Sequence, residues 1–239
     1  MVDNIKNEKD ILKRIFQIES GIKSNNNLIF QSRQMIEENR SMILNNYSSA
    51  FAGNNRLANA NTEEIFKNRN SILSKIKTNN DAEKKFILDE QNKAKLDFLD
   101  HQSNLNTIDL EISKEMAEIN TQLIEINKKI MEANESTVSF NSQQLKHNRN
   151  LLEKKFDFSK IDPEKNESTN HQNIEKIKKL ENNEQVNQKE LYKLLSKSKD
   201  NSNSLINNRK EILERRSSIM SNRETISVNK SKIFYSSKI

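Results

Sequence analysis

The sequence lacks cysteine and tryptophan, and its 239 residues include only two glycines and one proline. Without cysteine, neither a disulfide framework nor a thiolate metal site is available. Turns draw on glycine and proline for backbone angles that other residues resist, so this chain cannot supply the turns of a sandwich, a barrel or a doubly wound sheet. The scarcity therefore predicts an all-α fold of long helices with few connections.

Apolar residues are also few, since 33% of the chain is hydrophobic and 31% is charged. This composition is too polar for one large globular core and is typical of elongated helices in a coiled coil or extended helical bundle. No run approaches the roughly 18–20 apolar residues that span a bilayer. The N-terminal stretch mixes acids with bases and lacks the apolar region of a secretory signal. We therefore expect the protein in the cytoplasm, or in a virion or particle assembled there.

The net charge of +6 is unevenly distributed along the chain. Residues 205–239 carry 8 Lys/Arg and 3 Asp/Glu, whereas residues 81–204 carry 20 and 23. A basic C-terminal segment beside an acidic middle suits staggered self-association, and it equally suits binding to nucleic acid or an anionic membrane. A third interpretation is an ordinary solvated helix surface.

One internal repeat stands out: an apolar residue, two arbitrary residues and then asparagine, recurring every seven residues. Alternating spacings of 3 and 4 place both residues on one helix stripe, with the apolar residue at heptad position a and the asparagine at d. The repeat slips by one residue between Asn46 and Asn54, and it runs unbroken from Asn120 to Asn148. The predicted oligomer interface comprises Ile22, Asn25, Ile29, Ile36, Asn39, Ile43, Asn46, Ile65, Asn68, Ile124, Asn127, Met131, Asn134, Val138, Asn141, Leu145, Asn148, Leu205, Asn208, Ile212, Ile219, Asn222, Ile226, Asn229 and Ile233.

Asparagine in the seam between helices is informative because a buried amide must find a hydrogen-bond partner. Repeated polar layers therefore predict helices aligned in one register at the expense of stability. The alternative is that these side chains lie at the edge of the stripe and bind water. Arginine often follows the asparagine, and at flank position e it is predicted either to contact a neighbouring subunit or to be solvated; these residues are Arg40, Arg69, Arg149, Arg209 and Arg223.

An aliphatic residue at a with asparagine at d is similar to the stalks of trimeric fibres, such as autotransporter stalks and phage whisker-type fibres. The resemblance covers about half of the chain and implies a homo-oligomeric fibre. The chain departs from one continuous stalk because turns separate its blocks.

Three segments are expected. An N-terminal helical segment spans 1–78, with a kink or break near 47–55. A central long helix spans 82–156, and C-terminal helical segments span 163–239, basic from 205. Asp81 is predicted to cap the central helix, and Pro163 after Asp162 predicts a helix start. A weaker break is expected at 197–204.

Catalytic signatures are missing from the sequence. The two glycines cannot form a phosphate-binding glycine-rich loop, and HExxH is absent. The three histidines, at 101, 147 and 171, are far apart, and none follows a glutamate by three residues. We therefore expect no catalytic, cofactor-binding or metal site, no small-molecule substrate and no enzyme activity.

The expected function is that of a structural protein that self-associates through its heptads into a fibre, filament or particle scaffold. Its partner is then itself, with a trimer and a higher-order filament both open. The alternative is a helical adaptor or tether whose basic C-terminal helix binds nucleic acid or an anionic membrane surface.

Overall fold

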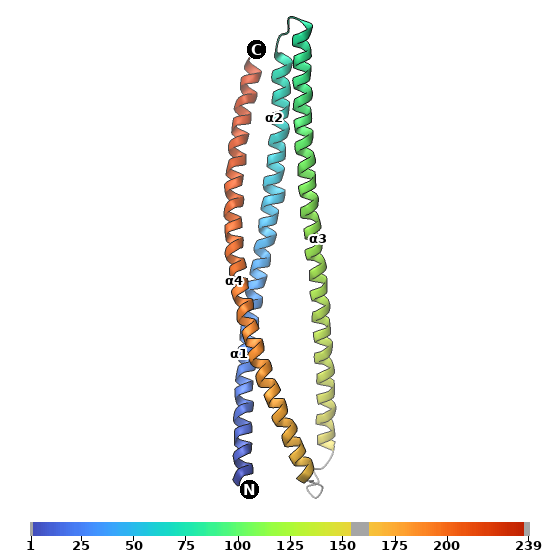
Figure 1. Ribbon diagram of the computed structural model, residues 1–239, viewed down its shortest axis with the longest axis vertical. Helices are drawn as coiled ribbons and strands as arrows, with labels where there is room; N and C mark the ends of the chain where they lie inside the picture. Colours follow the sequence, from blue (N-terminus) through green and yellow to red (C-terminus); the bar gives the residue numbers. More distant parts are fainter. Residues whose placement is uncertain (1, 154–162, 237–239) are drawn as a thin grey trace. The chain divides into compact units, whose positions relative to one another are not determined.

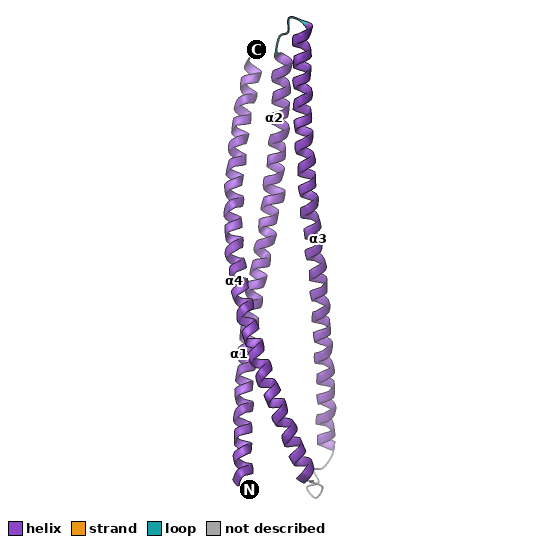
Figure 2. Cartoon of the chain, viewed as in Figure 1, coloured by secondary structure: helices purple, strands orange, loops and turns teal. Residues whose placement is uncertain are grey.

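The computed structural model describes residues 2–153 and 163–236, with side chains over 9–153 and 169–236. Every element within these ranges is a helix, which confirms the all-α fold class (Figures 1 and 2). In chain order they are α1 (Val2–Ser48), the π-helix η1 (Ser49–Asn55), α2 (Arg56–Lys75), α3 (Asp81–Glu153) and α4 (Pro163–Tyr235). The chain divides into two compact units, one built from α1, η1, α2 and α4 and the other from α3.

The first unit is a parallel pair of helices. Asn25 contacts Glu184 and Asn68 contacts Ile226, so the contact partners advance together along both helices. Figure 1 shows α4 running in the same direction as α1 and α2, with the two termini at opposite ends of this unit. No interior proline interrupts these helices, and α4 starts at Pro163, where the missing N–H of proline has no helical partner to lose. Asp162, which precedes Pro163 in the predicted helix start, lies outside the described residues.

The N-terminal end of α3 is closed by Asn80 rather than by the predicted Asp81. The Glu83 main-chain N–H donates to Asn80 Oδ1 at 2.9 Å, and the Glu83 carboxylate accepts from the Asn79 N–H and from Asn80 Nδ2. This arrangement is a variant of the capping box, because the Glu83 carboxylate binds the main-chain N–H one residue before the cap and the cap's side chain, and not the main-chain N–H of the cap itself. The prediction was therefore wrong by one residue.

The break expected at 197–204 is also wrong, because α4 continues through this segment. Its polar residues include Ser198, which is buried, and the Ser198 carbonyl accepts a hydrogen bond from Asn39 of α1. Packing against α1 thus keeps the segment helical, although it lacks apolar anchors of its own.

Candidate functional site

Asparagines of α1, η1 and α2 donate side-chain hydrogen bonds to main-chain carbonyls of α4. We call this row of contacts the asparagine ladder. Its members, with the Nδ2–O distances, are Asn25 to Glu184 (3.0 Å), Asn39 to Ser198 (2.7 Å), Asn46 to Leu205 (2.9 Å), Asn54 to Ile212 (2.8 Å), Asn61 to Ile219 (2.9 Å) and Asn68 to Ile226 (3.3 Å). The acceptors recur at multiples of seven residues, so the ladder follows the heptad.

The ladder lies deeper in the first unit than the apolar residues beside it. From Asn25 to Asn61 its members are only 6–8% exposed, whereas Ile22, Ile29, Ile36 and Ile43 are 40–43% exposed. The ladder asparagines of α1 therefore face α4 and not solvent. The isoleucines at the a positions flank this polar seam and remain partly exposed to solvent.

Main-chain carbonyls accept these amides because the two helices are parallel. Helical side chains lean toward the N-terminus of their own helix, and carbonyl groups point toward its C-terminus. An asparagine of one helix therefore meets a carbonyl of its neighbour head-on only when both run the same way. Each carbonyl has two lone pairs, so it accepts the amide in addition to its own helical N–H.

The π-helix η1 corrects the register of the ladder. Asn46 and Asn54 are eight residues apart, whereas their acceptors Leu205 and Ile212 are seven apart. A π-helix accommodates one extra residue without interrupting the helix. The donor and acceptor numbers accordingly differ by 159 up to Asn46 and by 158 from Asn54 onward. The kink or break expected near 47–55 is thus a π-helix that joins α1 to α2 without interruption.

Two ladder positions carry other residues. Ser32 stands between Asn25 and Asn39 and is almost fully buried. Lys75 ends the ladder, with its ammonium group donating to the carbonyls of Ile233 and Ser236. A cation is well placed there because the C-terminal end of α4 carries partial negative charge.

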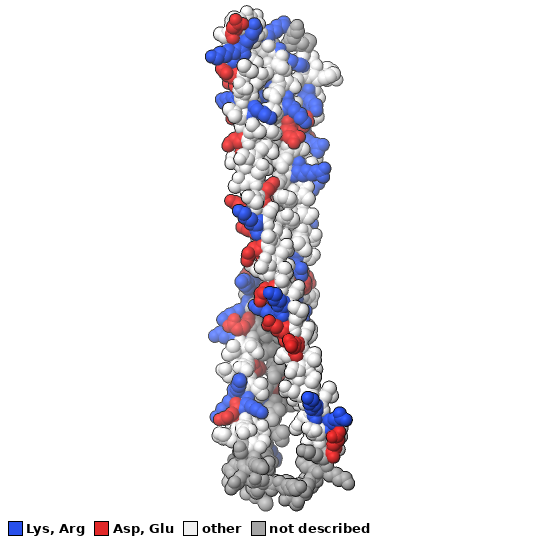
Figure 3. All heavy atoms as spheres, turned by 90° about the vertical axis from the view of Figure 1, so that its right-hand side faces the viewer, with Lys and Arg blue, Asp and Glu red and all other residues white. Residues whose placement is uncertain are grey.

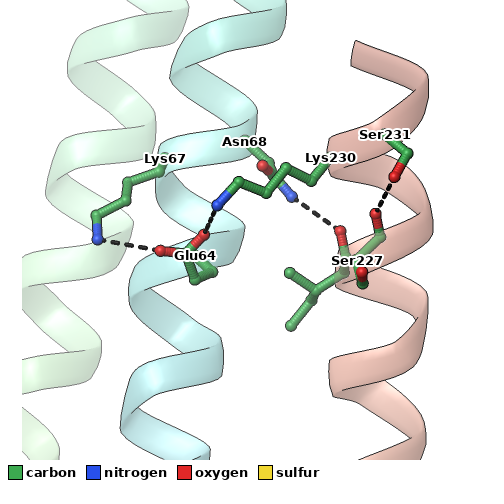
Figure 4. A network of polar contacts seen from close by, with 7 residues as sticks. Glu64, Lys67, Asn68, Ser227, Lys230 and Ser231 are labelled. Carbon is green, nitrogen blue, oxygen red and sulfur yellow. Dashed lines mark hydrogen bonds and ion pairs between the residues drawn. The ribbon is translucent and has the colours of Figure 1, made fainter. Parts of the chain in front are cut away.

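Two ion pairs connect the helices beside the seam. The Arg14 guanidinium donates to both carboxylate oxygens of Glu181, at 2.9 and 2.8 Å. Lys230 of α4 binds Glu64 of α2 at 3.0 Å, and Lys67 also binds this carboxylate (Figure 4). In the heptad frame each pair joins position g of one helix to position e of the other, as in parallel coiled coils.

These ion pairs lower the pKa of both carboxyl groups. The hydrogen bond from Arg14 is the main cause for Glu181, and burial opposes it. For Glu64 the main cause is the hydrogen bond from Lys230, followed by that from Lys67. Neither pair was predicted from the sequence, although opposite charges at positions g and e of aligned heptads were the signal that identifies them.

The predicted flank arginines form no contact between subunits in this single chain. Arg40 pairs with Glu37 and Arg149 with Glu153, each within its own helix. Arg209 and Arg223 lie exposed on α4, and Arg69 lines a groove between α2 and α4. Contact of these arginines with a neighbouring subunit stays a prediction.

The repeat on α3 is uncovered in the single chain. At its a positions Ile124, Met131, Val138 and Leu145 are 59–68% exposed. The accompanying asparagines, namely Asn120, Asn127, Asn134, Asn141 and Asn148, are exposed as well. On α4 the residues Leu205, Ile212, Ile219, Ile226 and Ile233 are buried or half-buried, whereas Asn208, Asn222 and Asn229 are exposed. The structure thus brings together the first block and the apolar residues of the last, and their packing against other copies stays a prediction.

Residues 2–153 and 163–236 contain no cluster of three or more potential metal ligands among His, Cys, Asp and Glu. Within the same residues, no helix is long and apolar enough to cross a membrane. Figure 3 shows Lys and Arg interspersed with Asp and Glu along the face that it presents.

Comparisons with protein families, with curated proteins and with solved structures find no match for this chain. Its class is therefore defined by the fold and the seam: an all-α protein of long helices, with a parallel helix pair held by an asparagine ladder.

Proposed function

We propose that the protein is a non-enzymatic structural protein that self-associates through its heptads into a fibre, filament or particle scaffold. It would work in the cytoplasm or in a virion or particle assembled there. The observation that carries the proposal is the uncovered repeat on α3, which has the same pattern as the α1 repeat that packs against α4.

Two features of α3 support a role in assembly. Its apolar a positions from Ile124 to Leu145 all lie exposed along one side of the helix, and exposed apolar surface of this kind marks interaction sites in proteins. The repeat from Ala117 to Asn148 extends roughly 45 Å along the helix, which is enough for a long contact with another helix. Aliphatic residues would drive this association, and asparagines would align the copies as the ladder aligns α1 with α4.

Negative-stain imaging of the full chain tests this proposal. We expect rods, filaments or particles larger than one chain, and we expect the double variant Met131→Glu, Val138→Glu to reduce them to small species. Ser136→Glu is the matched control and should leave the assemblies intact, because Ser136 is at position f, on the side of the helix opposite the a/d stripe. Uniform particles the size of one chain in the wild type would contradict the proposal.

A second candidate is an adaptor or tether that binds an anionic surface through the basic C-terminal part of α4. Phe234 and Tyr235 are highly exposed beside Lys232, and such aromatic and cationic neighbours suit a membrane interface. Sedimentation with vesicles containing anionic lipid tests it. Binding that disappears with salt and with Arg209→Gln, Arg223→Gln favours this candidate, and absence of binding rejects it.

A further inference from the structure

The contact between α1 and α4 uses only half of the hydrogen-bonding groups that the two helices offer. Asn46 follows Ile43 by three residues, just as Asn208 follows Leu205. Asn46 is buried and donates to the Leu205 carbonyl, whereas Asn208 is exposed. Each helix thus has a donor row of asparagines at d and an acceptor row of carbonyls at a, and the pair joins the donors of one to the acceptors of the other.

The two remaining rows are unused within the part of the chain that the structure describes. On α4, the exposed side chains of Asn208, Asn222 and Asn229 bind no other residue that the structure describes. On α1, the carbonyls of the a residues Ile22, Ile29, Ile36 and Ile43 accept no side-chain hydrogen bond there. The same chain therefore carries a donor row and an acceptor row that are free to bind another helix, both with heptad spacing.

Both rows lie on one side of the pair. One groove is lined by Ile22, Asn25 and Ile29 of α1 together with Asn187 and Leu194 of α4. A second groove, farther along, has the equivalent lining of Ile65, Asn68 and Ile72 of α2 with Ile226 and Asn229 of α4. We call this side, formed by the a positions of α1–α2 and the d positions of α4, the open face.

Buried oxygens in the seam indicate a missing donor. The Oδ1 atoms of Asn25, Asn39 and Asn54 are buried and have no hydrogen-bond donor within the described residues. Leaving such an acceptor unsatisfied costs roughly 1–3 kcal/mol. Asn25 also lines the first groove, so the layer that holds this Oδ1 borders the open face. An amide group has two N–H donors, and one asparagine can therefore serve both a carbonyl and a neighbouring Oδ1.

We propose that two copies of this chain associate through their open faces, as parallel pairs related by a twofold axis along the helices. The α4 asparagines of each copy donate to the α1–α2 carbonyls of the other, and the half-exposed isoleucines of both copies become covered. The result is a closed ring of four parallel helices, in which each helix donates to the next. This inference rests on the proposed function, because it specifies one interface of the self-association.

A second copy satisfies both unused rows with groups that this chain itself carries. A single parallel helix of another protein with the same pattern also accepts from α4 and donates to α1–α2, but only a second copy gives a disulfide between chains that carry Ile65→Cys and Asn229→Cys. A twofold rotation brings the donor row of each copy to the acceptor row of the other, as the self-complementarity of such interfaces requires. The copies must be parallel for the same reason as α1 and α4, since an asparagine meets a carbonyl head-on only between parallel helices.

Disulfide trapping tests the proposal, and a chain without cysteine is well suited to it. A chain carrying Ile65→Cys is mixed with a tagged chain carrying Asn229→Cys and then oxidised. We expect a disulfide-linked pair of the two, because Asn229 of one copy reaches Ile65 of the other. Ile22→Cys mixed with Asn229→Cys is the control, which joins the two chains only if the copies are antiparallel. Linkage in this control, or none in the first mixture, overturns the proposal.

A pair of matched variants measures the energetic role of the unused donors. Asn208→Asp removes the donor from the open face, and we expect the dissociation constant of the dimer to rise about tenfold or more. Asn207→Asp makes the same change at an exposed neighbour on another side of α4 and should leave it unchanged. Equal effects of the two variants overturn the proposal. A wild-type mass of one chain in solution overturns this proposal and the proposed function together, whereas larger assemblies without the expected disulfide overturn this proposal alone.

Discussion

Asn39 donates its side-chain N–H to the main-chain carbonyl of Ser198 at 2.7 Å, while its own Oδ1 lies buried without a donor in the described chain. The contact is therefore half satisfied. The Ser198 carbonyl does not depend on Asn39, since it also accepts the N–H of its own helix. Position 39 aligns two helices at a cost in stability, as polar residues in coiled-coil seams do.

Replacing Asn39 with leucine should stabilise the chain. Leucine has nearly the same branched shape, removes the unsatisfied Oδ1 and buries apolar surface, and these gains exceed the hydrogen bond of about 1 kcal/mol that is lost. We expect the free energy of unfolding to rise by about 1–2 kcal/mol, measured by urea denaturation.

Asn39→Asp is the contrasting variant, because it removes the donor and places a carboxylate against the Ser198 carbonyl oxygen. We expect it to lower the free energy of unfolding by about 3 kcal/mol at pH 7. If leucine destabilises the chain as much as aspartate does, the amide contributes more to stability than a single hydrogen bond of about 1 kcal/mol.

Much of this architecture was predictable from local patterns. Scarce glycine and proline predicted long helices, and the heptad predicted both the stripe that contains Asn25 to Asn68 and the one-residue slip. The acceptors were not predictable, because a main-chain carbonyl leaves no trace in the side-chain sequence. The continuity of α4 through 197–204 depends on packing of Ser198 against α1, which local composition does not reveal. The Asn80 cap was visible as an Asn-x-x-Glu motif and was placed one residue too late.

Deleting one residue from the π-helix should leave the ladder intact. Without Ser49, which is exposed, the spacing from Asn46 to Asn54 becomes seven and matches that of the acceptors. An ordinary α-helix then keeps the donors opposite their acceptors. We therefore expect the melting temperature, followed by circular dichroism, to stay the same or rise.

Deleting Glu63 is the control. It shifts all later residues of α2 by one position, which turns Asn68 and Lys75 away from α4 and removes their ladder contacts. These are three hydrogen bonds of about 1 kcal/mol each, whose loss corresponds to a fall of roughly 6–12 °C in the melting temperature. Equal destabilisation by the two deletions would show that η1 has a role beyond register.

The ion pair between Arg14 and Glu181 should make stability depend on pH. Arg14 lowers the pKa of Glu181 in the folded chain below its ordinary value of 4.5. The pair therefore contributes stability above pH 4.5, and this contribution is lost as the pH falls through the lowered pKa. A double-mutant cycle with Arg14→Gln and Glu181→Gln should show coupling at pH 7 that vanishes at low pH. Coupling of equal size at both pH values contradicts this assignment.

The asparagines of α3 should control assembly more than stability. Replacing Asn127, Asn134 and Asn141 with isoleucine extends the apolar stripe, so we expect thermal stability to rise while the oligomeric state becomes less uniform. Circular dichroism and light scattering measure the two effects. An unchanged oligomeric state identifies this row of asparagines as a solvated surface feature.

The mass of the wild-type chain in solution, measured by light scattering during size-exclusion chromatography at micromolar concentration, tests self-association most directly. The account predicts a mass that is a multiple of the 27.9 kDa chain. A single monodisperse species with the mass of one chain would contradict it.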